Sequence, residues 1–331
     1  MGKTIVFLNK LNEYWLERIE KLKKEYPDST FITYKDTENL RSLIPQANGI
    51  VIGDISNEEV ENANNLEIIF GPWAGIDFLK KGILKKRGII LANTHGNSKA
   101  VAEHTVSLSL ALLGRIVEYH NDLERGLWHG FIKGSPKEDL WVSLMGKNCG
   151  ILGLGNIGLQ LAKILKNGFN CHIIGFKKHF TKEKYEFVDE IIFDLLELIQ
   201  KADIIFNVLP LTKETINLLN WEIISQMKNK FLISVGRALI IDEYALYRAL
   251  KEGILAGAAI DVWYNYPKTK DEVALPSVYP IHTFKNVVIS PHVGGFTVEG
   301  QTSMIDETIE NIKSYLTVGA PLSKVDLDLE Y

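Results

Sequence analysis

Gly153-Leu154-Gly155-Asn156-Ile157-Gly158 is the stretch of sequence that decides the fold. An apolar run from Asn148 to Leu152 precedes it, and a helix expected over 156–166 follows and ends at Asn167-Gly168. A further apolar run, Cys171–Phe176, completes a unit of about 30 residues, the length of a βαβ dinucleotide site. Its glycines let the backbone approach a pyrophosphate, and the helix N-terminus stabilises that charge. We therefore predict a dinucleotide-binding βαβ unit; a tight structural turn is the alternative.

The residues after the second strand of this unit bear on the choice of dinucleotide. An Asp or Glu about 20 residues beyond the glycines normally binds the ribose 2′-hydroxyl. Here Phe176 is followed by Lys177, Lys178 and His179. A carboxylate would repel a 2′-phosphate, whereas two ammonium groups attract it. The pair predicts that NADP(H) is favoured over NAD(H); the alternative is that both lysines belong to a solvated loop.

Two further side chains stand at the ends of strand-like runs. Arg237 lies just past Phe231–Val235, and His292 lies just past Asn286–Ser290. In an open parallel sheet, ligands bind outside the carboxyl ends of the strands. We therefore expect both side chains to gather around whatever the glycine turn holds, which is the layout of a nicotinamide-dependent enzyme.

The composition is that of an ordinary globular protein, with 46% hydrophobic and 24% charged residues. The 331 residues favour about two domains. A net charge of −4 gives no pull toward nucleic acid or an anionic membrane. Cys149 and Cys171 fall in apolar runs typical of buried thiols, and the histidines show no metal-ligand spacing, so we predict no metal. The sequence shows neither a signal peptide nor a spanning apolar stretch, so we expect a cytoplasmic protein.

Short Ile, Val and Phe runs alternate with amphipathic segments, which favours βα units on a mainly parallel sheet. In the first part we expect a helix at 13–24 and strands at 4–8, 31–33, 49–52 and 67–70. Ser98–Val117 is apolar on nearly all sides, which is typical of a helix buried in a core or a subunit interface. A last helix is expected at 299–316, where the chain would return to the first domain.

Several motifs follow one another along nearly the whole chain. Besides the glycine turn they are Gly71-Pro72-Trp73-Ala74-Gly75-Ile76-Asp77, Ala102-Glu103-His104-Thr105, Arg125-Gly126-Leu127-Trp128, Leu209-Pro210-Leu211-Thr212, Gly236-Arg237, Gly257–Val262 and Ser290-Pro291-His292-Val293-Gly294-Gly295. Single pieces are weak, but that many in one order and spacing are specific. On these motifs the chain resembles the D-isomer-specific 2-hydroxyacid dehydrogenase family, in particular its glyoxylate/hydroxypyruvate reductases.

The resemblance implies an α/β fold in two domains. A Rossmann dinucleotide-binding domain, residues 98–297, would be inserted in a flavodoxin-like substrate domain, residues 1–97 plus 298–331. The resemblance also implies a homodimer joined through the cofactor domains. The implied reaction is hydride transfer between NAD(P)H and a small 2-keto acid or D-2-hydroxy acid, such as glyoxylate or hydroxypyruvate.

The resemblance also assigns roles to residues. Arg237 matches the substrate-orienting arginine and His292 the acid/base. Trp73 would border the substrate, while the amides of Ala74 and Gly75 would hold its carboxylate. With the two lysines, the implied cofactor-binding residues are Thr105, Gly153, Gly155, Asn156, Ile157, Gly158, Leu209, Pro210, Thr215, Val235, Gly236, Asp261 and Gly294. These roles fit the chemistry, because a guanidinium holds a carboxylate and a keto oxygen in one plane and a histidine changes charge near neutral pH.

One position departs from the family pattern. A glutamate normally stands before the proline that follows Asp261-Val262, but here Tyr266 precedes Pro267. The carboxylate would favour the charged form of the histidine, which a phenol stabilises far less. Three interpretations follow. Tyr266 orients His292 in an active reductase and joins the catalytic candidates, or Asp271 or Glu272 of the nearby loop takes over. In the third, the protein is a cofactor-binding regulatory partner with weak or lost activity.

Overall fold

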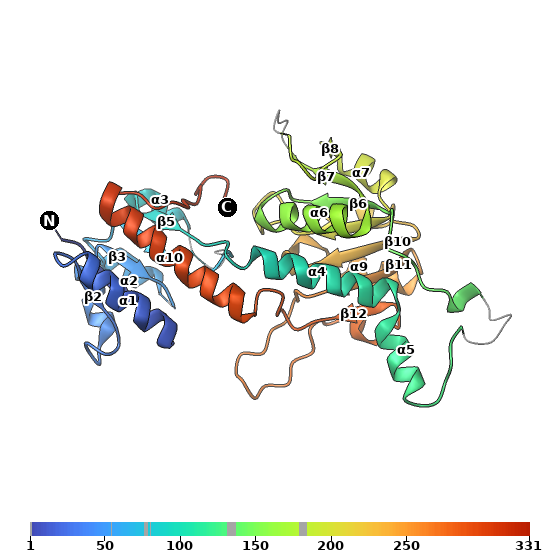
Figure 1. The fold of residues 1–331 in the computed structure, drawn as a ribbon, viewed down its shortest axis with the longest axis horizontal. Helices are drawn as coiled ribbons and strands as arrows, with labels where there is room; N and C mark the ends of the chain where they lie inside the picture. The colour runs from blue at the N-terminus through green and yellow to red at the C-terminus, as the bar shows by residue number, and fades with distance from the viewer. Residues whose placement is uncertain (1, 54, 76–78, 80, 131–136, 179–183) are drawn as a thin grey trace. The chain divides into compact units, whose positions relative to one another are not determined.

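The computed structural model describes residues 2–53, 55–75, 79, 81–130, 137–178 and 184–331. The chain divides into two compact units (Figure 1). The first comprises Met1–Asn97 and Thr297–Tyr331, and the second comprises Ser98–Phe296. Both ends of the chain therefore belong to the first unit.

The first unit is built on a five-stranded parallel sheet with the order β2-β1-β3-β4-β5. Its strands are β1 (Thr4–Phe7), β2 (Thr30–Ile32), β3 (Gly49–Val51), β4 (Ile68–Phe70) and β5 (Ile90–Ala92). Its helices are α1 (Glu13–Glu25), the 3-10 helix η1 (Leu40–Gln46), α2 (Asn57–Asn62), α3 (Lys81–Arg87) and α10 (Val298–Val318).

Strand β1 shows how both faces of this sheet are covered. Alternate residues of a strand point to opposite faces. Phe7 packs in a cluster with Trp15 of α1 and Ile309 of α10, whereas Val6 packs in a second cluster with Val60 of α2. Burial on both faces explains the nearly continuous apolar runs of these strands.

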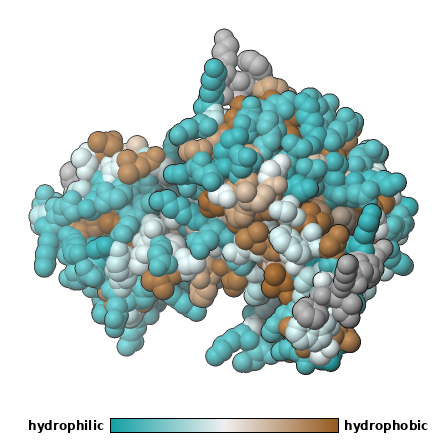
Figure 2. Space-filling model, turned by 45° about the vertical axis from the view of Figure 1, so that its right-hand side comes forward, coloured by the Kyte–Doolittle hydropathy of each residue, from teal (hydrophilic) through white to brown (hydrophobic). Residues whose placement is uncertain are grey.

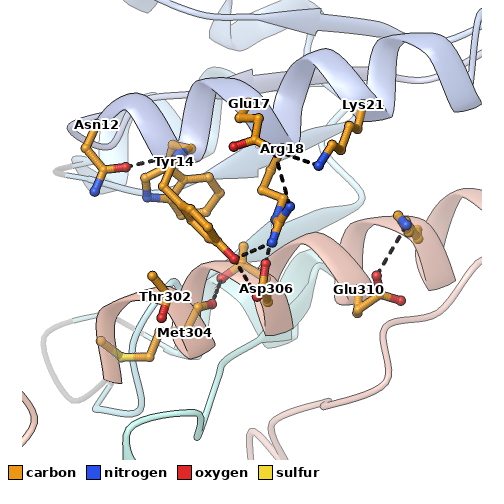
Figure 3. A network of polar contacts seen from close by, with 12 residues as sticks. Asn12, Tyr14, Glu17, Arg18, Lys21, Thr302, Met304, Asp306 and Glu310 are labelled. Atoms are coloured by element: carbon orange, nitrogen blue, oxygen red, sulfur yellow. Dashed lines mark hydrogen bonds and ion pairs between the residues drawn. The ribbon is translucent and has the colours of Figure 1, made fainter. Parts of the chain in front are cut away.

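A polar network fixes α10 against α1 (Figure 3). The Tyr14 hydroxyl donates to Asp306 Oδ2 at 2.8 Å, and Arg18 Nε donates to Asp306 Oδ1 at 2.7 Å. Burial raises the pKa of Asp306, but the hydrogen bonds from Arg18 and Tyr14 outweigh it, so that the pKa lies below its usual value. The carboxylate is therefore charged near neutral pH and ties the end of the chain to its first helix.

The second unit is built on a seven-stranded parallel sheet with the order β12-β11-β10-β9-β6-β7-β8. Its strands are β6 (Asn148–Leu152), β7 (His172–Phe176), β8 (Glu190–Ile192), β9 (Ile204–Asn207), β10 (Lys230–Ser234), β11 (Leu255–Ile260) and β12 (Val287–Ile289). Its helices are α4 (Ser98–Leu113), α5 (Ile116–Leu123), α6 (Asn156–Phe169), α7 (Leu195–Lys201), α8 (Trp221–Ile224) and α9 (Glu243–Lys251), with 3-10 helices η2 (Lys137–Asp139), η3 (Ala238–Ile240) and η4 (Ile281–Thr283).

The order of these strands reverses beside β6. The chain runs outward from β6 through β7 to β8, returns to β9 on the other side of β6, and continues outward to β12. Such a reversal opens a crevice outside the carboxyl ends of the two central strands, where open α/β sheets bind ligands. The predicted fold class, α/β with a Rossmann-type parallel sheet, is confirmed.

Two predicted helices have different bounds. The helix expected over 98–117 ends at Leu113, because Arg115 adopts a left-handed conformation (φ 51°), and α5 continues at an angle of 55°. In contrast, α6 does not end at Asn167-Gly168 but runs to Phe169, where Asn170 (φ 49°) caps it. In the described part of the chain, no single helix is long and apolar enough to span a membrane; only the bent pair α4 and α5 together has that length and character.

Candidate active site

The carboxyl edge of the seven-stranded sheet carries the polar groups of the candidate site. Ser234, Ile260 and Ile289 are in register across β10, β11 and β12. Arg237 follows β10 and His292 follows β12. Neighbouring strands lie about 4.8 Å apart, so the two segments leave the sheet roughly 10 Å from each other. Both side chains therefore originate at one edge, on either side of the strand that ends at Ile260.

The imidazole of His292 is in contact with Tyr266. The phenol oxygen lies 2.8 Å from Nδ1 of His292 and accepts a hydrogen bond from the Trp263 amide at 3.0 Å. The Trp263 indole donates to the Ser290 carbonyl at 2.7 Å, which joins the end of β11 to the end of β12. Of the loop carboxylates considered above, Glu272 accepts the amide of Lys268 at 2.6 Å. The group at Nδ1 is thus the phenol of Tyr266, and not a carboxylate of the loop.

The turn that carries His292 is held by Asp261. His292 has a φ of 58°, a left-handed conformation that costs a non-glycine residue of order 1 kcal/mol or more. Asp261 accepts the amides of Val293 and Gly294, both at 3.0 Å. Burial alone would raise the pKa of Asp261. The hydrogen bonds from His104, Ser290 and these two amides outweigh that effect, so the pKa lies below its usual value and the carboxylate is charged near neutral pH. Charge-assisted bonds of this kind offset the cost of the strained turn.

His104 and Ser290 complete this support, and sequence reasoning missed it. His104 Nε2 lies 2.9 Å from Ser290 Oγ and 3.5 Å from Asp261 Oδ1. A Cβ on Gly294 would lie 3.3 Å from the His104 ring, so the helix and the turn are in close contact. The only sequence signal was the presence of polar residues at the end of β12 and near the start of α4.

The glycine turn after β6 fits a bound pyrophosphate. Gly153 has a φ of 104°, and a Cβ on Gly158 would overlap the Gly153 carbonyl oxygen, so the protein's own geometry requires both glycines. Gly155 differs: its φ is −86°, and a Cβ there would meet no atom within 4 Å. Gly155 and Asn156 are exposed at the N-terminus of α6, beside Ile157. Open space at that point is what an anion at a helix N-terminus needs.

The loops after β9 and β10 pack together beside this turn. The amides of Val235 and Gly236 both donate to the Asn207 carbonyl at 3.1 Å, and a Cβ on Gly236 would lie 2.6 Å from the Leu209 carbonyl oxygen. Thr215 donates to the Pro210 carbonyl at 2.7 Å and so closes the loop after β9. Thr105 of α4 is fully buried, and its hydroxyl donates to the carbonyl of Val101 at 2.6 Å.

The two lysines beyond β7 already have contacts. Lys177 Nζ lies 5.3 Å from the centroid of the Tyr185 ring, and Lys178 Nζ lies 3.0 Å from Glu214 Oε2. Both side chains of that ion pair are more than half exposed, so the pair is weak. Lys178 can therefore separate from Glu214 and bind another anion. His179 lies outside the described residues.

The predicted carboxylate-binding loop follows β4 in the first unit. Asn93 Nδ2 donates to the Ala74 carbonyl at 3.1 Å, and the Thr94 amide donates to the Trp73 carbonyl at 3.5 Å. Trp73, Ala74 and Gly75 are half-buried. The remainder of this motif, Ile76 and Asp77, lies outside the described residues.

Among the residues that the structure describes, no three His, Cys, Asp or Glu side chains are grouped to hold a metal ion. The predicted lack of a metal stays a prediction for the chain as a whole.

Comparisons with known proteins show which family the chain is similar to. Residues 106–294 match the family described as D-isomer specific 2-hydroxyacid dehydrogenase, NAD binding domain. The chain is 34% identical over 278 residues to a glyoxylate reductase of Thermofilum pendens, covering 83% of this chain and 79% of that one. It is 33% identical over 302 residues to a D-3-phosphoglycerate dehydrogenase of Methanocaldococcus jannaschii, covering 89% of this chain and 55% of that one.

A solved structure extends the comparison to the whole chain. An NADPH-dependent glyoxylate/hydroxypyruvate reductase of Sinorhizobium meliloti, in complex with NADP and malonate, is 26% identical. It superposes with a TM-score of 0.77 and covers 100% of this chain and 98% of that one. The likeness therefore includes both units.

The glycine geometry predicts different outcomes for two alanine substitutions. Gly155→Ala should cost no more than about 1 kcal/mol of stability, the penalty for alanine at a helix N-cap. It should weaken NADPH binding about tenfold or more, because the methyl group occupies the open space at the helix N-terminus. Gly158→Ala should instead destabilise the fold by about 1–3 kcal/mol through overlap with Gly153. Urea unfolding and fluorescence titration with NADPH measure both effects; unchanged NADPH affinity in Gly155→Ala would place the pyrophosphate elsewhere.

Proposed function

The chain belongs to the D-isomer-specific 2-hydroxyacid dehydrogenase family, and from this premise we propose that it reduces a small 2-keto acid to the D-2-hydroxy acid. Glyoxylate and hydroxypyruvate are the substrates we favour. The observation that carries the proposal is the contact between the Tyr266 phenol and Nδ1 of His292, at 2.8 Å, which orients the imidazole through one of its two ring nitrogens. The enzyme is a nicotinamide-dependent oxidoreductase.

The site residues divide the work of the reaction. The bound nicotinamide supplies the hydride that reaches the keto carbon. The oxygen left by that transfer needs a proton, and His292 Nε2 donates it. Arg237 holds the carboxylate and the keto oxygen in one plane, which fixes the carbon for attack from one side. For the substrate carboxylate we propose, in addition, the amides of Ala74 and Gly75, with Trp73 beside them.

The alternative, a cofactor-binding regulatory protein of the same fold with little activity, is not favoured. The relatives compared above are named as a reductase and a dehydrogenase. The Tyr266–His292 contact also keeps the imidazole oriented, which a protein that had lost its chemistry would have no need to maintain.

Replacement of His292 tests the proposal directly. His292→Ala should lower kcat/KM for keto acid reduction by about 10²- to 10⁴-fold, the usual contribution of a general acid. The measurement is the loss of NADPH absorbance with glyoxylate, hydroxypyruvate, pyruvate and bulkier 2-keto acids. His172→Ala, at the amino end of β7 and so at the opposite edge of the sheet, is the matched control and should keep full activity. Full turnover by His292→Ala would refute the assignment.

We propose NADP(H) as the preferred cofactor. Lys177 and Lys178 follow β7, where an acidic residue would normally bind the ribose hydroxyl. The exposed ion pair of Lys178 with Glu214 can open to receive a 2′-phosphate at little cost.

Removal of the two lysines should weaken the binding of NADPH without weakening the binding of NADH. Lys177→Ala together with Lys178→Ala should raise KM for NADPH about tenfold, roughly 1.4 kcal/mol, and leave KM for NADH unchanged. Glu214→Gln, which frees Lys178 without removing its charge, is the control and should not raise KM for NADPH. A wild type that prefers NADH, or equal losses with both cofactors, contradicts the proposal.

We also propose a homodimer joined through the second unit. Apolar side chains are exposed on α5 and on the segment after it: Ile116, Val117, Leu123, Leu127, Trp128, Leu140 and Trp141. Figure 2 shows such apolar side chains at the surface of this unit. A second copy of the chain would remove this area from water. The cytoplasm remains the location we expect, because both cysteines are buried free thiols.

The oligomeric state follows from sedimentation velocity. Wild type should sediment at twice 37.3 kDa. Leu123→Glu combined with Leu127→Glu should yield the monomer, because two charges would be buried unpaired in the interface. Leu322→Glu, at an exposed apolar residue of the first unit, should remain a dimer. A monomeric wild type would rule out this interface.

A further inference from the structure

Tyr266 lies in the middle of a chain of two hydrogen bonds. The Trp263 amide points at the phenol oxygen from 3.0 Å, and the phenol lies 2.8 Å from His292 Nδ1. An amide N–H can only donate, so the phenol accepts from it. The phenol hydrogen is then available for Nδ1, which accepts it when the imidazole is neutral. A neutral ring whose Nδ1 accepts carries its hydrogen on Nε2.

A carboxylate in the same place would select the opposite arrangement. It has no hydrogen to give when charged, so it accepts one from Nδ1. In the neutral ring Nε2 would then carry no hydrogen, and only the imidazolium could donate a proton from Nε2. With a phenol, the neutral imidazole still presents an Nε2 hydrogen to the substrate. The substitution at residue 266 thus changes which charge state of His292 can act as an acid.

We propose that Tyr266 supplies the reaction with a proton through His292 when the imidazole is neutral. This proposal rests on the keto acid reduction argued above. As the alkoxide forms, its oxygen takes the Nε2 proton while the phenol proton moves to Nδ1. The Nε2–H and phenol O–H bonds break, and the alcohol O–H and Nδ1–H bonds form. His292 ends neutral in its other tautomer, and Tyr266 ends as a phenolate.

The surroundings suit each state of this relay. The phenolate keeps the Trp263 amide as a donor and gains a second donor in the new Nδ1–H. Tyr266 is 48% exposed, so solvent can return its proton for the next turnover. A phenolate is also a far weaker base than an alkoxide, which makes the transfer favourable.

The described charged groups around this pair do not replace the phenol as proton source. Asp261, from the end of β11, is buried, and its two carboxylate oxygens accept hydrogen bonds from the amides of the turn. His104, from α4, lies against Ser290. Glu272, from the loop after Tyr266, accepts the Lys268 amide. Arg237, after β10, carries a guanidinium, which is a hydrogen-bond donor and not a proton source.

The pH profile of the reduction is the readout that a merely structural role would not change. An imidazolium in water loses its proton near pH 6.5 and a phenol near pH 10, so the relay adds about three pH units of activity. Wild type should therefore keep kcat/KM for glyoxylate up to about pH 9–10. Tyr266→Phe should fall about tenfold per pH unit above about pH 7, because only the imidazolium remains as acid.

Two further variants make the test specific. Tyr264→Phe removes the neighbouring hydroxyl, which donates to the Ile241 carbonyl at 3.0 Å; it should change the rate without changing the shape of the profile. His292→Ala should be impaired at every pH. The rate is measured as single-turnover oxidation of NADPH, so that product release does not limit it. The same rate in mixtures of H₂O and D₂O shows how many protons move in the transition state. Wild type should show a curved dependence on deuterium fraction, and Tyr266→Phe a linear one.

The outcomes separate this proposal from the function on which it rests. Profiles of wild type and Tyr266→Phe that superpose after scaling would overturn the relay while leaving the reductase assignment intact. Wild type without turnover on any keto acid, or an active His292→Ala, would overturn both. An alkaline loss confined to Tyr266→Phe, together with the two-proton isotope pattern, supports the relay.

Discussion

All seven strands of the second unit's sheet run parallel, and this constraint determines where the site can be. Parallel strands end at one edge, so every loop that leaves a carboxyl end delivers its residues to that edge. The reversal of strand order beside β6 places the glycine turn and the loop after β9 next to each other. Arg237, Asp261 and His292 then follow three neighbouring strands in register. The parallel pairing of β10, β11 and β12 therefore determines which side chains can act together.

Asp261 converts that coarse placement into a defined geometry. A left-handed residue in an exposed turn would normally relax, yet His292 keeps a φ of 58° because the next two amides are bound to a buried carboxylate. The same carboxylate is supported from α4 through His104 and Ser290. A strained backbone at a functional site persists only where its surroundings over-determine it. Here one buried charge couples a helix, the end of β11 and the turn after β12.

The sequence was sufficient for the sheet, but not for the contacts that hold the predicted site residues in place. The pattern around Gly153 predicts β6 and α6 because glycine spacing and apolar runs are local signals. The break of the long helix at Arg115 was missed, since a left-handed arginine has no strong signature in composition. The bracing role of Asp261 was also missed, because its partner amides lie 32 and 33 residues farther along the chain. Only tertiary structure brings such groups together.

The phenol at residue 266 also changes the electrostatics of the site. Asp261 already places one buried negative charge beside the turn. A glutamate at residue 266 would add a second, and a substrate carboxylate would bring a third, so that like charges would repel one another. A neutral phenol–imidazole pair avoids that repulsion and needs little desolvation when a substrate covers it. In the proposed function Arg237 compensates the charge of the substrate, and the proton comes from a group that starts neutral.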